Sequence, residues 1–250
     1  MPAPDSPNPP RRRADVLLVE RGVFESRAKA QEAIAAGLVR AQGRLLAKPS
    51  ETLRADAEIE AAAPYPWVSR GGVKLEAALD AFFYDPAGLS CLDVGASTGG
   101  FTHVLLARGA SSVVAVDVGR GQLHPSLRSD RRVLSLEATD VRVLGPDALP
   151  APAGLIVVDV SFISLALVLP ALAALAAPDA ALVALIKPQF EAGRAHVAKG
   201  VVRDPAVHVA VCARVTRDVA ALGWRVAGVI PSPIEGGDGN REFLIGARRC

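Results

Sequence analysis

Five short apolar segments, the first beginning at residue 89, constrain the fold of this chain more than any other feature. They are rich in Val, Leu, Ile and Ala, mostly without alternating polar residues, and lie at 89–94, 112–116, 133–136, 155–159 and 181–186. Strands that are buried on both faces have this composition. Helical patterns fall between or before them, at 73–83, 101–108, 165–176 and 205–222. The alternation predicts an α/β fold of the doubly wound type, in which helices cover both faces of a parallel sheet.

Residues 14–62 follow a different pattern and predict a small, separate α+β domain. Two short helical patterns come first, and Ser26 is a good N-cap for the second of them, while Gly37 is a natural C-terminal stop. Gln42-Gly43 then lies between two strand-like pieces, as in a β-hairpin. Because about 50 residues make a marginal domain, we expect binding rather than chemistry from this region.

The segments on either side of this small domain carry Pro-rich sequence. Residues 1–13 are predicted to be a disordered tail, because the first ten contain five prolines and no aliphatic side chain larger than Met1. The segment 63–68, which is stiffened by two prolines, is predicted to be a linker. The α/β domain then occupies residues 69–250.

Basic residues are concentrated near the N-terminus. The net charge of the whole chain is only +2, yet residues 11–48 hold nine Lys or Arg against four Asp or Glu. Local basicity of this kind favours a polyanionic partner such as nucleic acid. A solvated surface can have the same composition, so the charge alone leaves both possibilities open.

The strongest local motif is the stretch 92–101, Leu-Asp-Val-Gly-Ala-Ser-Thr-Gly-Gly-Phe, in which a predicted strand runs into a glycine turn and then a helix. Glycine lets the backbone approach a ligand closely, and ligands of open parallel sheets bind at this edge. The pattern G-x-x-x-G-G differs from the G-x-G-x-x-G of dinucleotide sites, and Asp93 suits a cation better than a pyrophosphate. S-adenosylmethionine, which carries a sulfonium and an ammonium group, fits such a turn.

Acidic residues after the next two predicted strands support the same ligand. Asp117 is placed to accept hydrogen bonds from both ribose hydroxyls, and Asp140 from the adenine amino group. The last two predicted strands, 225–230 and 242–247, have no long helix between them, which is typical of the methyltransferase variant of the Rossmann-like fold. The predicted donor-binding residues are Asp93, Gly95, Ser97, Thr98, Gly99, Gly100, Phe101, Asp117 and Asp140.

Four charged residues lie where this fold would bring them to one edge of the sheet. Lys74 lies near the start of the helix before the first strand, and Glu242 opens the last strand. Asp159 and Lys187 end the fourth and fifth strands. A ribose hydroxyl must lose a proton as it attacks a methyl group, and a lysine can take that proton if burial or a nearby cation favours its neutral form. We therefore predict Lys187 as the general base, oriented and tuned by the other three, although any of them alone could be a surface ion pair.

The N-terminal region resembles the small RNA-binding domain first seen in a small-subunit ribosomal protein. The resemblance rests on Val-Glu-Arg-Gly at 19–22, Ser-Arg-Ala-Lys-Ala-Gln at 26–31 and Ala-Gly-Leu-Val at 36–39. In that family, basic residues beside the second helix contact RNA phosphates, and cations on a rigid helix suit regularly spaced phosphates. The RNA contacts that the resemblance implies are Arg21, Arg27, Lys29 and Arg40.

The Lys-Asp-Lys-Glu set is similar to the tetrad of the ribose 2′-O-methyltransferases related to FtsJ. Together with Ser-Arg-Gly-Gly-x-Lys-Leu from residue 69, Asp-Val-Ser-Phe-Ile-Ser from 159 and Lys-Pro-Gln-Phe-Glu from 187, it resembles the TlyA family, often labelled hemolysin A, over about residues 12–248. The resemblance implies methylation of cytidine 2′-hydroxyls in bacterial ribosomal RNA. Because the chain stops at Cys250, it resembles the shorter type that acts on large-subunit RNA, although residues 11–13 keep that assignment open.

Two other functions compete with an enzyme: a non-catalytic RNA-binding or ribosome-assembly protein, and a membrane-lytic protein, as the hemolysin label suggests. The apolar run 162–177 is shorter than the about 20 residues that span a membrane, and Pro170 interrupts it, so we expect no membrane partner. Cys91, Cys212 and Cys250 match no disulfide framework and no metal-ligand spacing, which predicts a reducing cytoplasm and no metal. We expect a monomer whose partner is ribosomal RNA or a ribosomal subunit.

Overall fold

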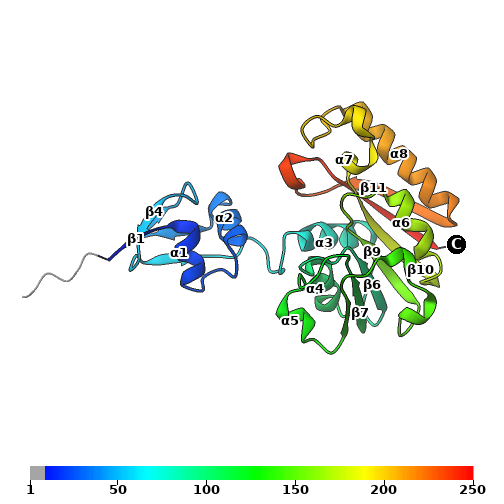
Figure 1. Cartoon of the computed structure of the whole chain (residues 1–250), viewed down its shortest axis with the longest axis horizontal. Coiled ribbons are helices and arrows are strands. Elements are labelled where there is room, and N and C mark those ends of the chain that lie inside the picture. Colours follow the sequence, from blue (N-terminus) through cyan, green and yellow to red (C-terminus); the bar gives the residue numbers. More distant parts are fainter. Residues whose placement is uncertain (1–8, 250) are drawn as a thin grey trace, which may run out of the picture. The chain divides into compact units, whose positions relative to one another are not determined.

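The computed structural model describes residues 9–249 and divides into two compact units between Pro66 and Trp67 (Figure 1). This division falls inside the segment 63–68 that we predict to be a linker. Residues 1–8 of the tail predicted to be disordered lie outside the described residues.

The N-terminal unit combines two short helices with small antiparallel sheets in its described part. One sheet has the order β3-β2-β5, and β1 pairs with β4 in another. Apolar side chains of both helices, among them Leu18 and Ile34, are fully buried against Val39 and Leu46. The elements are β1 (Arg11–Arg13), α1 (Ala14–Glu20), α2 (Arg27–Ala35), β2 (Val39–Ala41), β3 (Arg44–Leu45), β4 (Thr52–Arg54) and β5 (Ile59–Ala61).

Local signals for the second helix and the hairpin are confirmed. The Ser26 hydroxyl caps α2 by accepting a hydrogen bond from the Lys29 amide, and Gly37 follows the helix at φ +72°. Gln42 and Gly43, both at positive φ, form the two-residue turn between β2 and β3. Positive φ at both central residues is the geometry that matches the twist of a hairpin.

The prediction of a disordered tail through residue 13 is wrong for its last three residues. Residues 11–13 form β1, which pairs with residues 52–54, and the Ala14 amide donates to the Glu51 carbonyl. The Pro-rich composition ends at Pro10. Beyond it, backbone pairing with a strand some forty residues away orders the chain, and composition alone carries no information about such a partner.

The second unit has the α/β architecture predicted from the alternating pattern. Its longer elements are α3 (Gly71–Phe82), β6 (Ser90–Val94), α4 (Gly100–Ala107), β7 (Ser112–Val116), α5 (Pro125–Arg128), β8 (Val133–Leu136), β9 (Ala153–Val158), α6 (Leu165–Leu172), β10 (Ala176–Ile186), α7 (Pro188–Glu191), α8 (Pro205–Ala221), β11 (Trp224–Pro231) and β12 (Phe243–Arg249). Short 3-10 turns lie at Val141–Val143, Pro146–Ala148, Arg194–His196 and Gly237–Gly239.

The strands form one mixed sheet with the order β11-β12-β10-β9-β6-β7-β8 among the described residues. Strands β6 to β10 are parallel, whereas β12 is antiparallel to both of its neighbours. The predicted final hairpin is therefore confirmed, with β12 placed inside the sheet. Because β12 runs the opposite way, its first residue lies at the same edge as the last residues of the parallel strands.

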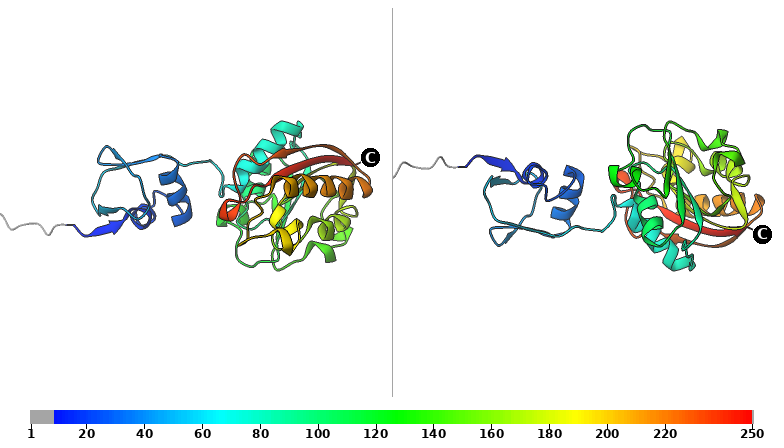
Figure 2. Two further views of the ribbon diagram at one scale, coloured as in Figure 1. Left: turned by 90° about the horizontal axis from the view of Figure 1, so that it is seen from above. Right: turned by 90° about the horizontal axis from the view of Figure 1, so that it is seen from below.

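Helices cover both faces of this sheet (Figure 2). Leu92, Val94 and Ile156 point to one face, where they pack in a common core with side chains of α6 and α8. Helices α3 and α4 pack together on the opposite face. Strands β6, β7 and β9 and the second half of β10 are buried on both sides, as their continuous apolar composition predicts. The same prediction is wrong for β8, which lies at the edge of the sheet and leaves Leu134 40% exposed.

Helix α6 is shorter than predicted, and β10 begins earlier. The helix ends at Leu172, because Ala176 already pairs with Ala153 in the sheet. The Arg249 guanidinium donates to the carbonyls of Ala173 and Ala176, at 2.7 and 2.9 Å, and so binds the chain where the helix stops. This capping group comes from the far end of the sequence. No helix within residues 9–249 is long and apolar enough to span a membrane.

Candidate active site

The glycine turn after β6 brings two strand ends close together. Gly95 has φ +83°, and a Cβ atom there would overlap the backbone carbonyl of Asp159 at the end of β9. Glycine is needed at this position for both reasons. Gly99, at φ +95°, lies instead against the side chains of Leu123 and Leu127 and does not line a described cavity. Gly99 thus has a packing role, and its predicted contact with the donor stays a prediction.

A second close approach fixes the position of Lys74. The Ser69 hydroxyl lies where a Cβ atom of Gly100 would be, so the entry to α3 packs directly on the start of α4. The N-terminal turn of α3 thus lies beside the glycine turn. Lys74 follows on the same helix, and its side chain is 7% exposed. The glycines of the Ser-Arg-Gly-Gly-x-Lys-Leu and Gly-Gly-Phe stretches therefore allow α3 and α4 to meet.

A cavity of about 480 Å³ opens where β6, β7, β8 and β9 end. Its volume lies within the range of about 300–1,000 Å³ that is usual for small-molecule sites. Four of the predicted donor-binding residues line it. They are Gly95, Ser97, Asp117 and Asp140.

A smaller cavity of about 230 Å³ adjoins the first, because Gly95, Ser97 and Asp159 line both of them. Its other walls come from α3 and from the start of α4. They include Lys74, Thr98, Gly100 and Phe101. The donor-binding and catalytic predictions thus meet in one connected space.

Asp117 connects two loops at this edge. One carboxylate oxygen accepts a hydrogen bond from the Ser97 amide at 2.8 Å, and the other from the Gly119 amide at 2.7 Å. Asp140 also faces the larger cavity, but its carboxylate is bound by the guanidinium of Arg142, which lowers the pKa of Asp140. The side chain of Asp140 is therefore already paired with Arg142, and its predicted contact with the adenine amino group stays a prediction.

Asp93 lies behind the cavity wall and not on it. Its side chain is fully buried, one oxygen accepts a hydrogen bond from the Thr102 hydroxyl at 2.6 Å, and the other has no partner among the described residues. Burial raises the pKa of Asp93 to about 7, and the charges of Asp159 and Asp117 add to this shift. Asp93 does not line either cavity. Asp93 thus contacts Thr102 inside the protein, and its predicted contact with a cationic ligand stays a prediction.

This buried carboxyl predicts that the catalytic unit loses stability as the pH rises from about 4 to about 7. An unfolded aspartate releases its proton near pH 4, whereas folded Asp93 keeps its proton until about pH 7. The folded state binds the extra proton in this window, so each pH unit lowers the free energy of unfolding by up to about 1.4 kcal/mol.

Urea unfolding followed by tryptophan fluorescence would measure this slope, because Trp67 and Trp224 are the tryptophans of the chain and both lie in the second unit. The Asp93→Asn variant should lose most of the slope. The same slope in this variant and in the wild type would contradict the assignment to Asp93.

The four predicted catalytic residues form two ion pairs. Lys187 Nζ lies 2.6 Å from an Asp159 carboxylate oxygen and donates to the Ser161 hydroxyl at 2.8 Å. Lys74 Nζ lies 2.5 Å from a Glu242 carboxylate oxygen. The side chains of Lys74 and Glu242 are 7% and 3% exposed, and those of Lys187 and Asp159 are 11% and 21% exposed.

Strand register brings the two pairs to the same place. Ile186 of β10 is paired with Phe243 of β12, so Lys187 and Glu242 are the next residues beyond this last paired position. Their partners Lys74 and Asp159 both line the smaller cavity. The structure therefore brings all four predicted residues together, as expected from their places at the strand ends.

Gly236 provides space for Glu242. A Cβ atom at this position would overlap the Glu242 carboxylate, although the φ of Gly236 is not in the left-handed region. The Gly236 amide also donates to the Asn240 carbonyl, and Asn240 binds the neighbouring loop through the Val202 amide and the Gly200 carbonyl. The loop before β12 is thus held so that Glu242 points at Lys74.

The Gly236→Ala variant should therefore lose activity while it stays folded. The new methyl group displaces the Glu242 carboxylate from Lys74 and not the backbone, and we expect about a 10- to 100-fold lower transfer rate. Initial rates of methyl transfer would measure the effect. Gly145→Ala is the matched control, because no atom lies within 4 Å of its Cβ position. Equal rates for the two variants would contradict this role of Gly236.

Several residues of the site could not be singled out from the sequence. Ser161 lies two positions after Asp159, and this spacing in Asp-Val-Ser was the one available signal. Phe162 lines the larger cavity although it is 91% exposed and has φ +65°, and its ring lies 5.1 Å from that of Phe190. Its place in an apolar run suggests burial, so only the tertiary structure reveals this exposed aromatic ring.

The predicted RNA contacts lie in the N-terminal unit, where all four have partners inside the protein. Arg27 donates to the fully buried carboxylate of Asp15 at 2.9 Å, and Arg13 donates to it at 3.0 Å. The Arg13 guanidinium holds the pKa of Asp15 well below its ordinary value. The Lys29 side chain is 15% exposed and lies over the Tyr65 ring.

The other two predicted contacts, Arg21 and Arg40, are both exposed residues that donate to backbone carbonyls. Arg21 donates to the Ala57 carbonyl through a partly buried hydrogen bond. Arg40 is exposed on β2 and donates to the Gly43 carbonyl. Of the four predicted residues, Arg21, Arg27 and Arg40 are exposed, and only Lys29 is partly buried.

Comparisons with known proteins identify both units. The FtsJ-like methyltransferase model matches residues 67–249, and the S4 domain model matches residues 12–59. A protein of Mycobacterium tuberculosis named 16S/23S rRNA (cytidine-2′-O)-methyltransferase TlyA is 48% identical over 241 residues, which are 95% of this chain and 90% of that protein. This chain belongs to the TlyA family of FtsJ-like methyltransferases.

Solved structures agree with this membership. A structure from Streptococcus thermophilus that carries the name hemolysin has 43% identity and a TM-score of 0.77, covering 96% of this chain and 89% of that one. An S-adenosylmethionine-dependent methyltransferase from Listeria monocytogenes shares the fold at 13% identity, with a TM-score of 0.55 over 72% of this chain and 98% of that one. The TlyA-family chain is thus a methyltransferase with S-adenosylmethionine as its methyl donor.

The residues at the cavity fit this donor. Each Asp117 carboxylate oxygen accepts one amide hydrogen bond and has capacity for another, which two ribose hydroxyls can supply. Gly95 and Ser97 line the same cavity beside Asp117. No group of His, Cys, Asp or Glu side chains among residues 9–249 has the arrangement of a metal site.

Proposed function

We propose that this protein methylates the ribose 2′-hydroxyl of a cytidine in bacterial ribosomal RNA, with large-subunit RNA as its substrate. The observation that carries the proposal is the meeting of two ion pairs, Lys187–Asp159 and Lys74–Glu242, at the donor cavity. The name of the M. tuberculosis relative, which includes cytidine and both 16S and 23S rRNA, supports the substrate class. We further propose that the protein acts in the cytoplasm as a monomer and without a metal.

Asp117 and the glycine turn would hold the donor in the larger cavity. Asp117 would accept the ribose hydroxyls, and Asp140 would accept the adenine amino group while it stays bound to Arg142. Asp93 would act from behind the turn, where its carboxyl orients Thr102 on α4. When bound, S-adenosylmethionine supplies a methyl group on a positively charged sulfur, which leaves as a neutral thioether.

Lys187 would take the proton of the RNA 2′-hydroxyl as that oxygen attacks the methyl carbon. Asp159, 2.6 Å from Lys187 Nζ, stabilises the ammonium group that results, and Ser161 orients the nitrogen. Lys74 and Glu242 place a second, nearly buried pair of opposite charges beside the same cavity. The remaining contribution is positioning of the hydroxyl in line with the breaking bond between sulfur and carbon.

Phe162 offers a surface for the target base. Its exposed ring lines the donor cavity three residues after Asp159, and a base that leaves its stack gains by stacking on an aromatic side chain. The ring would hold the cytosine while its ribose faces Lys187.

Methyl transfer from labelled donor to ribosomal subunits purified from cells without this enzyme would test the function. We expect a 2′-O-methyl mark at a cytidine of the large subunit, located by mapping modified nucleotides in the extracted RNA. A mark on the small subunit alone would overturn the proposal that large-subunit RNA is the substrate. An absence of transfer to either subunit would overturn the proposal that the protein is an rRNA methyltransferase. RNA binding without transfer would then favour a ribosome-assembly role, and leakage of lipid vesicles without transfer a membrane-lytic one.

Replacing Arg40 should weaken RNA binding and its dependence on salt. An arginine that contacts one phosphate releases about one counterion, so Arg40→Gln should reduce the slope of log affinity against log salt by about 1. Binding of a large-subunit RNA fragment at several salt concentrations would measure this. Arg132→Gln is the control, because this arginine lies in the other unit and is bound to Asp130. An unchanged slope for Arg40→Gln would contradict the prediction that Arg40 contacts an RNA phosphate.

A further inference from the structure

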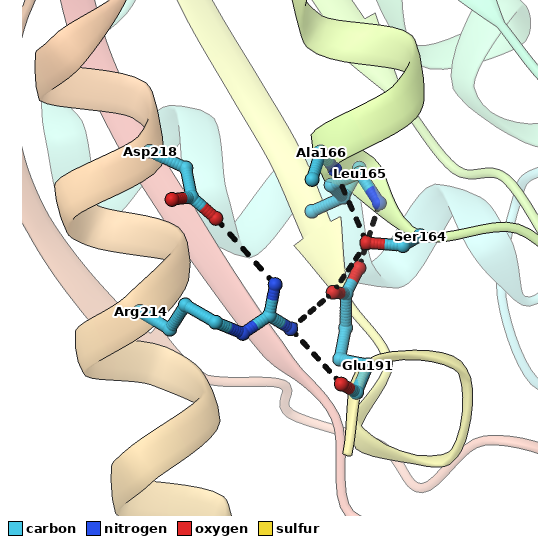
Figure 3. A network of polar contacts seen from close by, with 6 residues as sticks. All are labelled: Ser164, Leu165, Ala166, Glu191, Arg214 and Asp218. Atoms are coloured by element: carbon cyan, nitrogen blue, oxygen red, sulfur yellow. Dashed lines mark hydrogen bonds and ion pairs between the residues drawn. The ribbon is translucent and has the colours of Figure 1, made fainter. Parts of the chain in front are cut away.

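A network of polar contacts surrounds Glu191, four residues after Lys187, and the proposed reaction makes no direct use of it (Figure 3). The Glu191 side chain is 2% exposed and accepts hydrogen bonds from the Ser164 hydroxyl at 2.8 Å and the Leu165 amide at 2.7 Å. The Arg214 guanidinium of α8 binds the same carboxylate at 2.6 Å and the Glu191 carbonyl at 3.0 Å. Glu191 is therefore held from two sides.

Glu191 connects the two segments that carry the catalytic pair. One segment, residues 159–165, runs from β9 into α6, and the other, residues 187–191, follows β10. Lys187 contacts the first segment at Asp159 and Ser161. Four residues after Lys187, Glu191 contacts the same segment again at Ser164 and Leu165.

The ring contact between Phe162 and Phe190 lies between these two connections in both segments. The contacts thus occur in the same order along the two segments. A lysine side chain has a flexible four-carbon stem, so its ion pair alone does not fix how two loops slide past each other. Contacts at several separate points along the two segments do fix their relative position.

The first segment needs such support. Phe162 has φ +65° and is almost fully exposed, so neither local conformation nor burial holds it in place. Glu191 binds just beyond it, at the N-terminus of α6, where a negative charge is favourable and the Ser164 hydroxyl also caps the helix. Glu191 and Arg214 do not line either cavity described above.

We propose that Glu191, held by Arg214, is a positioning residue for methyl transfer. It sets the register between the two segments, and through them the place of Lys187 relative to Asp159, Ser161 and the bound donor. This inference rests on the proposed function of Lys187. The main effect falls on the rate of the chemical step, because Glu191 and Arg214 line neither cavity, although residues 159–163 of the segment that Glu191 holds form part of the wall of the larger cavity.

The test is single-turnover transfer with saturating donor and large ribosomal subunits, alongside donor affinity and tryptophan-monitored unfolding. Glu191→Ala should reduce the transfer rate constant about 10- to 100-fold, as expected when a catalytic group is misplaced by about 1 Å. Donor affinity should change by less than about threefold, which separates a loss of transition-state stabilisation from a loss of binding. Glu191→Gln keeps an acceptor for the Leu165 amide and should recover part of the rate.

Asp218→Asn is the matched control, since it removes the 3.5 Å contact on the other side of Arg214 and leaves Glu191 in place. It should transfer methyl groups at the wild-type rate. Wild-type rates in Glu191→Ala, or a rate loss that follows donor affinity or the unfolded fraction, would overturn the inference. If Glu191→Ala does not fold, a wild-type rate in Glu191→Gln would overturn it equally. A wild type without transfer would instead overturn the proposed function.

Discussion

Replacing Lys187 by alanine should abolish methyl transfer and leave donor binding almost unchanged. General-base catalysis contributes about 10²- to 10⁴-fold, and we expect a loss in this range in single-turnover transfer to large ribosomal subunits. Lys187 forms no part of the described walls of the donor cavity, so isothermal titration with S-adenosylmethionine should give a near wild-type affinity. Equal losses of transfer and of donor binding would show that Lys187 has a structural role.

The Lys187→Arg variant separates proton transfer from charge. An arginine at this position keeps a positive charge beside Asp159, but a guanidinium does not lose its proton in proteins and cannot act as a base. We therefore expect this variant to be as inactive as Lys187→Ala while it retains the fold and the donor affinity. Transfer above about a tenth of the wild-type rate would show that Lys187 acts only through its charge.

Breaking the pair of Lys74 and Glu242 should cost both stability and activity. Each side chain is less than a tenth exposed, so removing one partner leaves a nearly buried charge without its counterion. Loss of one member of a buried pair costs about 3–5 kcal/mol, and we expect this range for Lys74→Met and for Glu242→Gln at neutral pH. Urea unfolding followed by fluorescence of the two tryptophans would measure it.

The double variant Lys74→Met, Glu242→Leu distinguishes the two roles of this pair. Replacing both charges by apolar groups removes the unpaired charge, so the free energy of unfolding should return most of the way to the wild-type value. Transfer should stay low, because the second pair of charges beside the cavity is gone. A double variant whose loss of stability equals the sum of the single losses would show that the two charges do not interact.

The positions of the predicted catalytic residues show how much of the site can be predicted from sequence patterns. Lys187 directly follows a continuous apolar strand, and Asp159 follows another, so both were expected at the carboxyl edge of a parallel sheet. Strand composition and the rule that parallel strands end at one edge are sufficient for this. Which lysine pairs with which acid was not predictable, because it depends on the register between β10 and β12 and on the packing of α3.

The direction of the Asp93 side chain and the packing of Gly99 keep these two predicted residues away from the walls of the cavities. Asp93 and Gly99 belong to the motif that predicts donor binding, yet Asp93 points inward to Thr102, and Gly99 packs against Leu123 and Leu127. Neighbouring residues of a strand point to opposite faces. A sequence motif therefore predicts where the loop at a ligand site lies, but it does not predict which of its side chains reach the ligand. Asp140 does line the larger cavity, and Arg142, two residues away, is bound to its carboxylate.

The sequence by itself determined the α/β class, the small helical and hairpin elements of the N-terminal unit and the set of charged residues at the strand ends. These depend on local propensity, turn chemistry and the periodicity of apolar residues, all of which act over a few positions. Only the tertiary structure decided that residues 11–13 form a strand, that Arg249 binds the end of α6, and that Glu191 connects the two catalytic segments. Each of these is a contact between residues far apart in the chain, whose energy exists only once the fold has brought the partners together.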